Sequence, residues 1–572
     1  MTTSTFPAET RDFAIRRRIW RIAWGLLALA SLLLLFTRAL ARVDEGRYAE
    51  VAREMIASGG DFWGMRLMGV RYYEKPPMTY WMSAGAMKLL GVRDAAARLP
   101  LLLGMVATLG LCHRWTRREW GSEAARTGRA ILFSSIGFLV AMGILLTDPA
   151  LVLFFTATCL FLFEAYRPGA KRSAAWLTAA AAAAGCGVLT KGFVAIVLPG
   201  AILFLWLLWE RRARDLWRWS LVPVGLLFLA ALAAALAHIE RHNPEFNHRF
   251  IVLEHLARFM GTRPDQGHEE PFWYFVPVVL VLLCPWVFFV PRALRGIRAN
   301  RDLKTDSFSR FLVVWAAVVF LFFSASTGKL MSYILPMVPP MALLIARRGL
   351  LPGRSETDAV DRRLWAFGSV LPLLCPLGIA VFWALARTGA IRGDFGAPRW
   401  IAAAPVAAGA GIWLWVWIRG HWKTVPGLLL SVAAAYAPLG FLFSPLSGPE
   451  FLVGIEDNRA FYREVSRHVG PADVLLLCNK HNPALAFYLE RIPWMYRIRN
   501  ELADGLAMEP DRPGIFRTAA ALDAAMRGDP YRKHFAVLRK EHRAALALQG
   551  IRFDPEILAQ DREWLLLRLR LP

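Results

Sequence analysis

Carboxylates and lysines stand at the edges of apolar runs in this chain, where charged groups are costly without a partner. Asp44 and Glu45 open "DEGRYAEVAREM", Glu74 and Lys75 lie in "RYYEKPPMTYW", and Asp148 lies in "ILLTDPALVLF". A cation at such an edge can bind a phosphate group, and a carboxylate can stabilise a cationic sugar or amine. These stretches are the first candidates for a catalytic or binding site.

Each candidate also has a purely structural interpretation. Asp44 could cap the helix that begins there, because carboxylates are favoured at helix N-termini. Asp148 could belong to an Asp-Pro turn between two apolar segments. Lys329 and Tyr333, in "STGKLMSYILPM", could be interfacial anchors at the ends of neighbouring spans. Taken one at a time, these residues leave both interpretations open.

Histidines raise the question of a metal site. Of the 11 histidines, five lie close together in the sequence: His238, His242, His248, His255 and His268. Neutral imidazoles together with a carboxylate such as Glu74 can bind zinc, but histidines that are simply solvated at a headgroup surface are the alternative. The six cysteines include no CxxC pair, so neither a disulfide framework nor a zinc–thiolate site is supported.

The composition is that of a membrane protein. The chain has 572 residues, 56% of them hydrophobic, and a mean hydropathy of +0.38. Runs such as "WGLLALASLLLLF" are typical of bilayer spans. The net charge of +24 comes from basic residues between those runs, which favours cytoplasmic loops over nucleic-acid binding. The basic N-terminal stretch and the apolar run after it, with no small-residue cleavage site, predict an uncleaved first span and a cytoplasmic N-terminus.

The segment 78–92 decides the topology. As a span it would place the basic "HRWTRREW" and every later basic loop outside the cytoplasm, against the positive-inside rule. It is also too short, since a span needs roughly 20 apolar residues, and it contains Lys88. We therefore expect 78–92 to be an interfacial amphipathic helix outside the cytoplasm.

Thirteen spans follow, at about 20–38, 98–114, 127–146, 149–166, 174–190, 193–209, 216–238, 272–293, 309–325, 331–348, 364–386, 399–418 and 424–444. An odd number places the C-terminus outside. Residues 445–572 contain no span and alternate short apolar strands with helical stretches, which predicts a small α/β domain. The fold class is thus a mostly α, polytopic membrane domain over 1–444, with outer loops at about 39–97 and 239–271, followed by that domain.

On this topology Lys75, Arg258 and Lys329 lie at the outer headgroup level, where the positive-inside rule disfavours cations. Binding of a lipid phosphate would explain all three. Carboxylates facing such a lipid predict transfer of a lipid-linked group. The sequence has no Gly-rich phosphate loop, which agrees with a donor that is not a nucleotide sugar.

Six motifs taken together resemble a known family. They are "VDEGRYAEVAREM", "YYEKPPMTYWMSAGAMKLLGVRDAAARLP", "LLTDPAL", "EHLARF", "HEEPFWYF" and "STGKLMSYILPMVPPMALL". They resemble the GT-C membrane glycosyltransferases of the protein O-mannosyltransferase superfamily, and most closely the bacterial undecaprenyl phosphate–4-amino-4-deoxy-L-arabinose (aminoarabinose) arabinosyltransferases. The resemblance is strongest through the first ten predicted spans.

The resemblance implies a GT-C fold in the bacterial inner membrane, with periplasmic juxtamembrane helices and a periplasmic C-terminal domain. It implies a lipid-linked pentosyltransferase that moves aminoarabinose from undecaprenyl phosphate to lipid A phosphates, which modifies lipopolysaccharide and gives resistance to polymyxin. The implied partners are the undecaprenyl-phosphate-linked sugar, lipid A and membrane lipids, with no nucleic acid.

The resemblance also assigns roles to matching residues. Asp44 and Asp148 are the implied catalytic or sugar-positioning carboxylates, and Lys75, Arg258 and Lys329 the implied ligands of the lipid phosphate. The implied cavity residues are Glu45, Tyr72, Tyr73 and Tyr333. Glu74 and His255 could hold a structural divalent metal such as zinc, although the chemistry itself requires no cofactor.

Two other functions remain open. A related GT-C transferase would use a polyprenyl-phosphate sugar on protein hydroxyls. A lipid-linked sugar transporter or flippase, from a different class, predicts charged residues at span centres, whereas Arg38 and Lys191 lie near span ends. For a lipid A acceptor, which is already anionic, the two aspartates would chiefly orient the sugar rather than remove a proton.

Overall fold

The computed structural model describes residues 6–40, 44–170, 173–217, 222–257, 269–299, 305–350, 365–366, 370, 399–442, 458–498, 502–509, 512–529, 531–543, 554–561 and 563–570. Contacts between Cα atoms divide the chain into two units. Unit 1 comprises Met1–Arg38, Arg98–Ala233 and His255–Leu452. Unit 2 comprises Ala39–Ala97, Ala234–Glu254 and Val453–Pro572, so two internal segments group with the C-terminal part of the chain.

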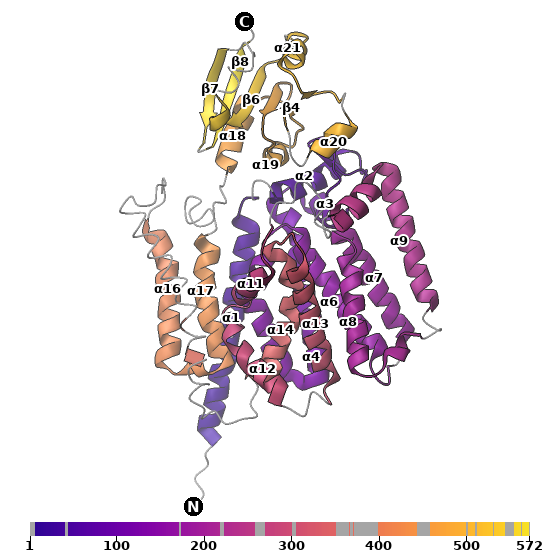
Figure 1. Cartoon of the computed structure of the whole chain (residues 1–572). Helices are drawn as coiled ribbons and strands as arrows, with labels where there is room; N and C mark the ends of the chain where they lie inside the picture. The colour runs from indigo at the N-terminus through magenta and orange to yellow at the C-terminus, as the bar shows by residue number, and fades with distance from the viewer. Residues whose placement is uncertain are drawn as a thin grey trace, which may run out of the picture. The chain divides into compact units, whose positions relative to one another are not determined.

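Unit 1 is built from helices (Figure 1). They are α1 (Phe6–Thr37), α4 (Asp94–Ser134), α5 (Ile136–Ala141), α6 (Thr147–Tyr166), α7 (Ser173–Lys191), α8 (Val194–Trp209), α9 (Val222–His242), α11 (Phe275–Leu282), α12 (Val290–Ala299), α13 (Ser307–Ala325), α14 (Val338–Leu344), α16 (Arg399–Ile418) and α17 (Val425–Leu442). The first residues of α4 and the last residues of α9 belong to unit 2. Shorter 3₁₀ and π turns occupy 213–217, 248–257, 272–274, 286–289, 331–337, 345–350 and 421–423.

Within the described ranges, six helices are long and apolar enough to cross a membrane, or seven if one bent pair counts as a span. The six are α1, α4, α6, α7, α9 and α13. Four shorter apolar helices occupy Val194–Trp209, Met331–Arg347, Ala407–Ile418 and Val425–Tyr436. Nearly all of the predicted span at 364–386 lies outside the described residues. A multi-pass membrane protein is therefore confirmed, whereas the number of thirteen spans stays a prediction.

The segment 127–146 is not the continuous helix that its apolar sequence predicted. Helix α4 ends at Ser134, and Ser135 adopts an extended conformation before the short helix α5. Both serine hydroxyls donate to carbonyls four residues earlier, at 2.6 and 2.7 Å, a pattern that bends helices. The indole of Trp286 donates to the Ser134 hydroxyl at 2.8 Å, which fixes the break from outside.

The segment 272–293 is also broken. Helix Phe272–Leu282 and helix Trp286–Arg295 meet at an angle of 107°. Pro285 stands at this corner, where its missing N–H and its ring prevent the helix from continuing. The predicted single span is therefore a bent pair.

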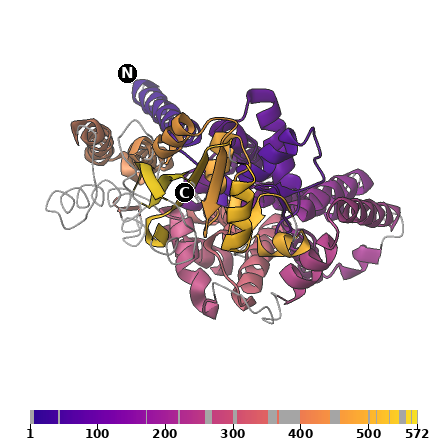
Figure 2. The ribbon, with the colours of Figure 1, turned by 90° about the horizontal axis from the view of Figure 1, so that it is seen from above.

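Helix α6 is the most buried of the helices in unit 1 that could cross a membrane: 78% of its apolar stretch is buried inside the protein. Helices α7 and α8 and the turn 331–337 all pack against it. Small residues permit close approach of such helices: a Cβ on Gly187 of α7 would lie 2.7 Å from the Ala195 Cβ of α8. Helix α17 packs against both α1 and α16, which Figure 2 shows from above.

Unit 2 begins with α2 (Asp44–Ala57), the two-stranded hairpin of β1 (Arg66–Leu67) and β2 (Val70–Arg71), and α3 (Met78–Leu90). Helix α3 has 13 residues and so spans roughly 20 Å, less than the hydrocarbon core of a bilayer. The expectation that 78–92 is helical but too short to cross a membrane is met. Its place at the membrane surface stays a prediction.

The C-terminal part of unit 2 is an α/β arrangement. Its helices are α18 (Arg459–His468), α19 (Pro483–Leu489), α20 (Ala503–Met508) and α21 (Ala519–Arg527), and its strands are β3 (Val474–Cys478), β4 (Trp494–Tyr496), β5 (Ile515–Phe516), β6 (His534–Arg539), β7 (Asp554–Gln560) and β8 (Trp564–Arg570). The strand order is β5-β4-β3-β6-β8-β7. Strands β5, β4, β3 and β6 are parallel, and β8 runs antiparallel to both of its neighbours, β6 and β7. The strand β3, "VLLLC", is buried throughout, as expected for the middle of a covered parallel sheet.

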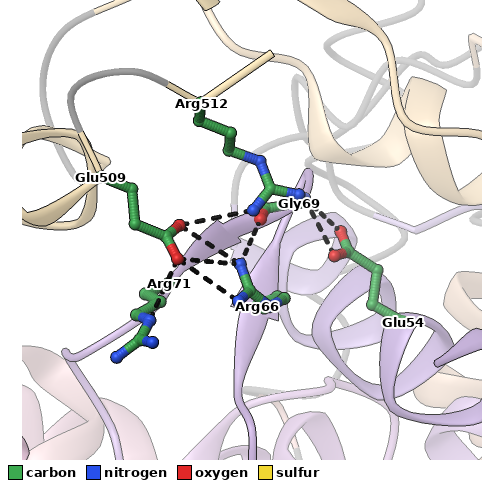
Figure 3. Close-up of polar contacts among 6 residues, drawn as sticks. All are labelled: Glu54, Arg66, Gly69, Arg71, Glu509 and Arg512. Carbon is green, nitrogen blue, oxygen red and sulfur yellow. Dashed lines mark hydrogen bonds and ion pairs between the residues drawn. The ribbon is translucent and has the colours of Figure 1, made fainter. Parts of the chain in front are cut away.

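A carboxylate hub joins the hairpin β1–β2 to the C-terminal part within unit 2 (Figure 3). Glu509 accepts hydrogen bonds from Arg66, from the Arg71 Nε at 3.0 Å and from Arg512 at 3.4 Å. On the other side of the hairpin, both oxygens of Glu54 accept from the Gly69 N–H at 2.9 and 3.0 Å. The segment that leads into "YYEKPP" is thus fixed at both sides by side-chain carboxylates.

Candidate functional site

Asp148 lies in a buried polar cluster of unit 1. The residue is 6% exposed; its carboxylate forms an ion pair through Oδ1 with the Lys191 ammonium and accepts at Oδ2 from the Ser332 hydroxyl at 3.0 Å. The Lys191 ammonium also lies 4.0 Å from the centre of the Tyr333 ring. Asp148 therefore lies in a helix with two side-chain partners rather than in an Asp-Pro turn, and its role in catalysis stays a prediction.

Local structure explains why these groups meet. Asp148 is in the first turn of α6 and Lys191 is the last residue of α7. A carboxylate at a helix N-terminus and a cation at a C-terminus are each favoured by the helix dipole. Because α6 and α7 are consecutive helices packed side by side, the start of one lies beside the end of the other.

Lys329 is a second buried cation of unit 1. It is 4% exposed, and its ammonium donates to the backbone carbonyl of Glu270 at 2.6 Å. A short bridge between Glu269 and Gly328 holds the two segments together. Within the described part of the chain, Lys329 has no carboxylate partner. A buried ammonium bound only to a carbonyl retains donors for an anion.

Unit 2 holds the other predicted carboxylate. Asp44 is the first residue of α2, and its side chain is 61% exposed. Arg47 donates to Asp44 at 2.8 Å and to Glu74 at 3.3 Å. Glu45, beside it, is almost completely buried. Asp44 is thus both a helix-start residue, as the structural interpretation held, and part of a charged cluster.

The "YYEK" loop supplies the aromatic and basic groups of this cluster. The Tyr72 hydroxyl donates to Glu74 at 3.2 Å, and burial raises the pKa of Tyr72 well above its usual value, so the phenol remains a neutral donor. The Arg249 guanidinium lies 5.3 Å from the centre of the Tyr73 ring. Lys75 is half-buried and, among the residues described, takes part in no hydrogen bond or ion pair.

The predicted metal ligands are not brought together in the described part of the structure. Glu74 is engaged by Arg47 and Tyr72, and no group of three possible ligands was found among the residues described. Arg258 and the side chain of His255 lie outside those residues. His238 and His242 pack against each other and around Trp63 rather than as a ligand pair.

The sequence reasoning missed three contributors. Lys191 lies at the end of a predicted span, where a lysine is usually interfacial, and its partner Asp148 lies 43 positions earlier. Arg47 lies three residues after Asp44, a spacing at which helix side chains meet, and this signal was available. Ser332 had no signal of its own beyond its place between Lys329 and Tyr333.

Comparison with known proteins follows this geometry. A sequence family described as dolichyl-phosphate-mannose-protein mannosyltransferase matches residues 25–247. The protein named undecaprenyl phosphate-alpha-4-amino-4-deoxy-L-arabinose arabinosyl transferase from Erwinia tasmaniensis is 32% identical over 364 residues, 62% of this chain and 64% of the relative. The relative of the same name from Edwardsiella ictaluri is 34% identical over 331 residues, 56% of this chain and 59% of the relative. The match thus spans less than two thirds of each relative.

The fold comparison covers nearly the whole chain. The crystal structure of ArnT from Cupriavidus metallidurans bound to undecaprenyl phosphate has a TM-score of 0.78, covers 96% of this chain and 97% of that one, and is 23% identical in sequence. The apo structure of the same protein has a TM-score of 0.77. The chain therefore has the fold of that ArnT structure, and the sequence similarity that its motifs predicted, to a mannosyltransferase family and to aminoarabinose transferases, is confirmed over part of the chain.

Proposed function

We propose that this protein transfers 4-amino-4-deoxy-L-arabinose from undecaprenyl phosphate to phosphate groups of lipid A. The observation that carries the proposal is that each unit holds a lysine partly or largely removed from water without a carboxylate partner among the described residues: Lys75 in unit 2 and Lys329 in unit 1. Each retains donors for the oxygens of a phosphate. The names of the relatives supply the identity of the donor and of the sugar.

The donor chemistry accounts for the cations. When the sugar leaves, negative charge builds up on the oxygens of the polyprenyl phosphate. An ammonium that is partly or largely removed from water stabilises that charge more strongly than an exposed one. The predicted phosphate ligand Arg258 would add a bidentate donor.

The carboxylates act on the sugar. Its anomeric carbon passes through a state with oxocarbenium character, which a nearby carboxylate stabilises. Both oxygens of Asp148 are already engaged, by Lys191 and Ser332, which supports a role in charge and orientation rather than in taking a proton. A lipid A phosphate is anionic near neutral pH and needs little help from a base. The exposed Asp44 is the carboxylate better suited to the 4-amino group of the sugar.

The proposed location is the bacterial inner membrane, with the N-terminus in the cytoplasm and residues 445–572 in the periplasm. The basic loops between apolar helices support this orientation. A second candidate function is transfer to a protein hydroxyl, which the description of the matching sequence family favours. Such an acceptor must lose a proton, so it would require one aspartate to act as a base.

Substitution of Lys75 tests the proposal. Loss of one charge-assisted phosphate contact costs about 1.5–3 kcal/mol, so Lys75→Gln should raise the KM for the lipid-linked donor by about 10- to 100-fold. Lys88→Gln is the matched control, because Lys88 is an exposed lysine of the neighbouring helix α3. Donor titrations of both variants in detergent micelles, with thermal unfolding as a folding check, give the comparison. An equal KM in the two variants would remove Lys75 from the donor site.

A further inference from the structure

The C-terminal sheet of unit 2 has a topological switch point that the proposed transfer reaction does not use. Strand β3 is followed by α19 and the neighbouring strand β4, and the chain later returns through α21 to β6 on the opposite side of β3. In open sheets with parallel strands, ligands bind outside the carboxyl ends of the strands at such a point. Here that place is the edge where β3 ends at Cys478 and β6 ends at Arg539.

This edge carries a net positive charge. Six basic residues lie at the ends of the four parallel strands or in the few residues after them: Lys480, Arg497, Arg517, Arg539, Lys540 and Arg543. The described carboxylates at this edge are Glu541 and, in the turn from β7 to β8, Asp561 and Glu563, and Glu563 pairs with Arg539 at 3.3 Å. The opposite edge is nearly balanced, because Asp473, Glu490 and Asp529 accompany its cations. The excess charge is therefore specific to the edge at which the fold places ligands.

The two connections at the switch point lie close together. The pKa of Glu541 is lowered from its usual value, first by a hydrogen bond from Arg539 and further by the charges of His542 and Lys480. Because β3 and β6 are paired neighbours, with Leu477 opposite Val537, Lys480 lies beside the connection that follows β6. Neither Lys480 nor Lys540 has an ion pair with any residue described in the structure.

Two buried nitrogens without a partner lie in the connections that follow β3 and β6. Asn482 is 2% exposed, and its Oδ1 accepts from the Leu485 N–H at 3.0 Å and from the Tyr462 hydroxyl at 3.2 Å. Its Nδ2 is buried and has no partner among the described residues. The Nδ1 of His542, a donor when that nitrogen carries the proton, is also buried without a described partner. Buried donors of this kind are costly unless a ligand or water satisfies them.

We infer that the carboxyl edge of β3 and β6 is a binding site for a phosphate-bearing ligand, held by Lys480, Lys540 and the buried donors of Asn482 and His542. Lysines at such an edge suit phosphate as point charges, and the amide can donate to a phosphate oxygen. The phosphorylated headgroup of the acceptor lipid is the source that the proposed function provides, and this assignment of source rests on that function. A small soluble phosphate compound has the same chemistry.

Lysine footprinting of the full-length protein in nanodiscs tests the site without a substitution. An amine-acylating reagent is applied with and without a probe, and peptide mass spectrometry compares Lys480 and Lys540 with Lys533. Lys533 is the matched control, because it is exposed and directly precedes the same strand β6 that Lys540 follows. The probes are inorganic pyrophosphate, bisphosphorylated lipid A and dephosphorylated lipid A. We expect protection of Lys480 and Lys540 but not of Lys533.

The pattern of protection identifies the source. Protection by pyrophosphate shows that phosphate alone suffices, and protection by bisphosphorylated lipid A alone identifies the lipid headgroup. The inference is overturned if no probe lowers the acylation of Lys480 and Lys540 relative to Lys533. It is also overturned if dephosphorylated lipid A protects these lysines as well as bisphosphorylated lipid A does.

A pair of variants gives a second measurement. Lys480→Gln/Lys540→Gln should bind the protecting probe at least about tenfold more weakly, whereas Arg532→Gln/Lys533→Gln at the opposite edge should bind it unchanged. Equal affinities in the two variants, with equal thermal unfolding, overturn the site. Because the readout is binding, a protein that transfers no sugar but still shows the protection would count against the proposed function and not against this site.

Discussion

Replacement of Lys191 by methionine separates the structural role of the Asp148 ion pair from its functional role. In the variant, Asp148 remains buried at 6% exposure with the Ser332 hydroxyl, 3.0 Å away, as its remaining described partner. Removing one partner of a buried ion pair costs about 3–5 kcal/mol, and the remaining hydrogen bond favours the lower end of that range. We therefore expect a loss of about 3 kcal/mol in stability together with a loss of transfer activity.

The double variant Lys191→Met/Asp148→Asn distinguishes the causes. It leaves no buried charge without a partner, so most of the lost stability should return. Activity should not return, because the carboxylate that orients the sugar is absent. Thermal unfolding in detergent and kcat/KM for transfer are measured on the same preparations.

The other end of α6 offers a matched control. Glu164 is 3% exposed, accepts from Arg118 at 2.7 Å and pairs with Arg167 at 3.0 Å, in a cluster to which we assign no function. Because Arg167 remains as a partner, Arg118→Met should lose less stability than Lys191→Met, and both Arg118→Met and Arg118→Met/Glu164→Gln should retain transfer activity. If Lys191→Met/Asp148→Asn also regains wild-type kcat/KM, then Asp148 is a structural residue and its proposed role is wrong.

Three further predictions concern unit 2. Burial raises the pKa of Glu509, but the hydrogen bond and charge of Arg66 and the neighbouring guanidinium groups lower it by more, so the pKa lies below its usual value. The stability that Glu509 contributes is therefore present above the usual Glu pKa of about 4.3 and is lost as the pH falls below it. The pH dependence of unfolding of Glu509→Gln should lack this loss at acid pH. Gly46→Ala should destabilise the protein by about 1–3 kcal/mol, because a Cβ there would lie 2.8 Å from the backbone N and the Cβ of a residue in α19, whereas Gly85→Ala, with nothing within 4 Å, should be nearly neutral in the same unfolding measurement. Asp44→Asn should lose most transfer activity but little stability, because its side chain is 61% exposed; full activity would reduce Asp44 to a helix-start residue.

The sequence predicted the membrane class and the α/β character of the C-terminal part and singled out Asp148 as a candidate, because apolar runs, alternation and a carboxylate between two spans are local signals. The partner of Asp148 is not a local signal. A lysine at a span end is usually an interfacial residue, and only the side-by-side packing of α6 and α7 brings Lys191 to Asp148. The sequence also does not predict that Glu74, the expected zinc ligand, contacts Arg47, because the two residues are 27 positions apart.

The broken segment at 127–146 shows a second limit of sequence reasoning. Its hydropathy is that of a continuous span, and serines are tolerated in such helices. The break at Ser135 depends on hydroxyl groups that bond back along the helix and on the indole of Trp286, 152 positions from Ser134. Periodicity within a window contains no information on a contact of that kind.

Transfer of the sugar itself tests the central claim most directly. The purified full-length protein is incubated with undecaprenyl-phosphate-linked 4-amino-4-deoxy-L-arabinose and an equimolar mixture of bisphosphorylated lipid A and a serine-rich acceptor protein, and both products are examined by mass spectrometry. We predict that lipid A gains one aminopentose on a phosphate and that the protein acceptor gains none. Modification of the protein acceptor with unmodified lipid A, or no transfer to either by a protein that binds the donor, would contradict the account.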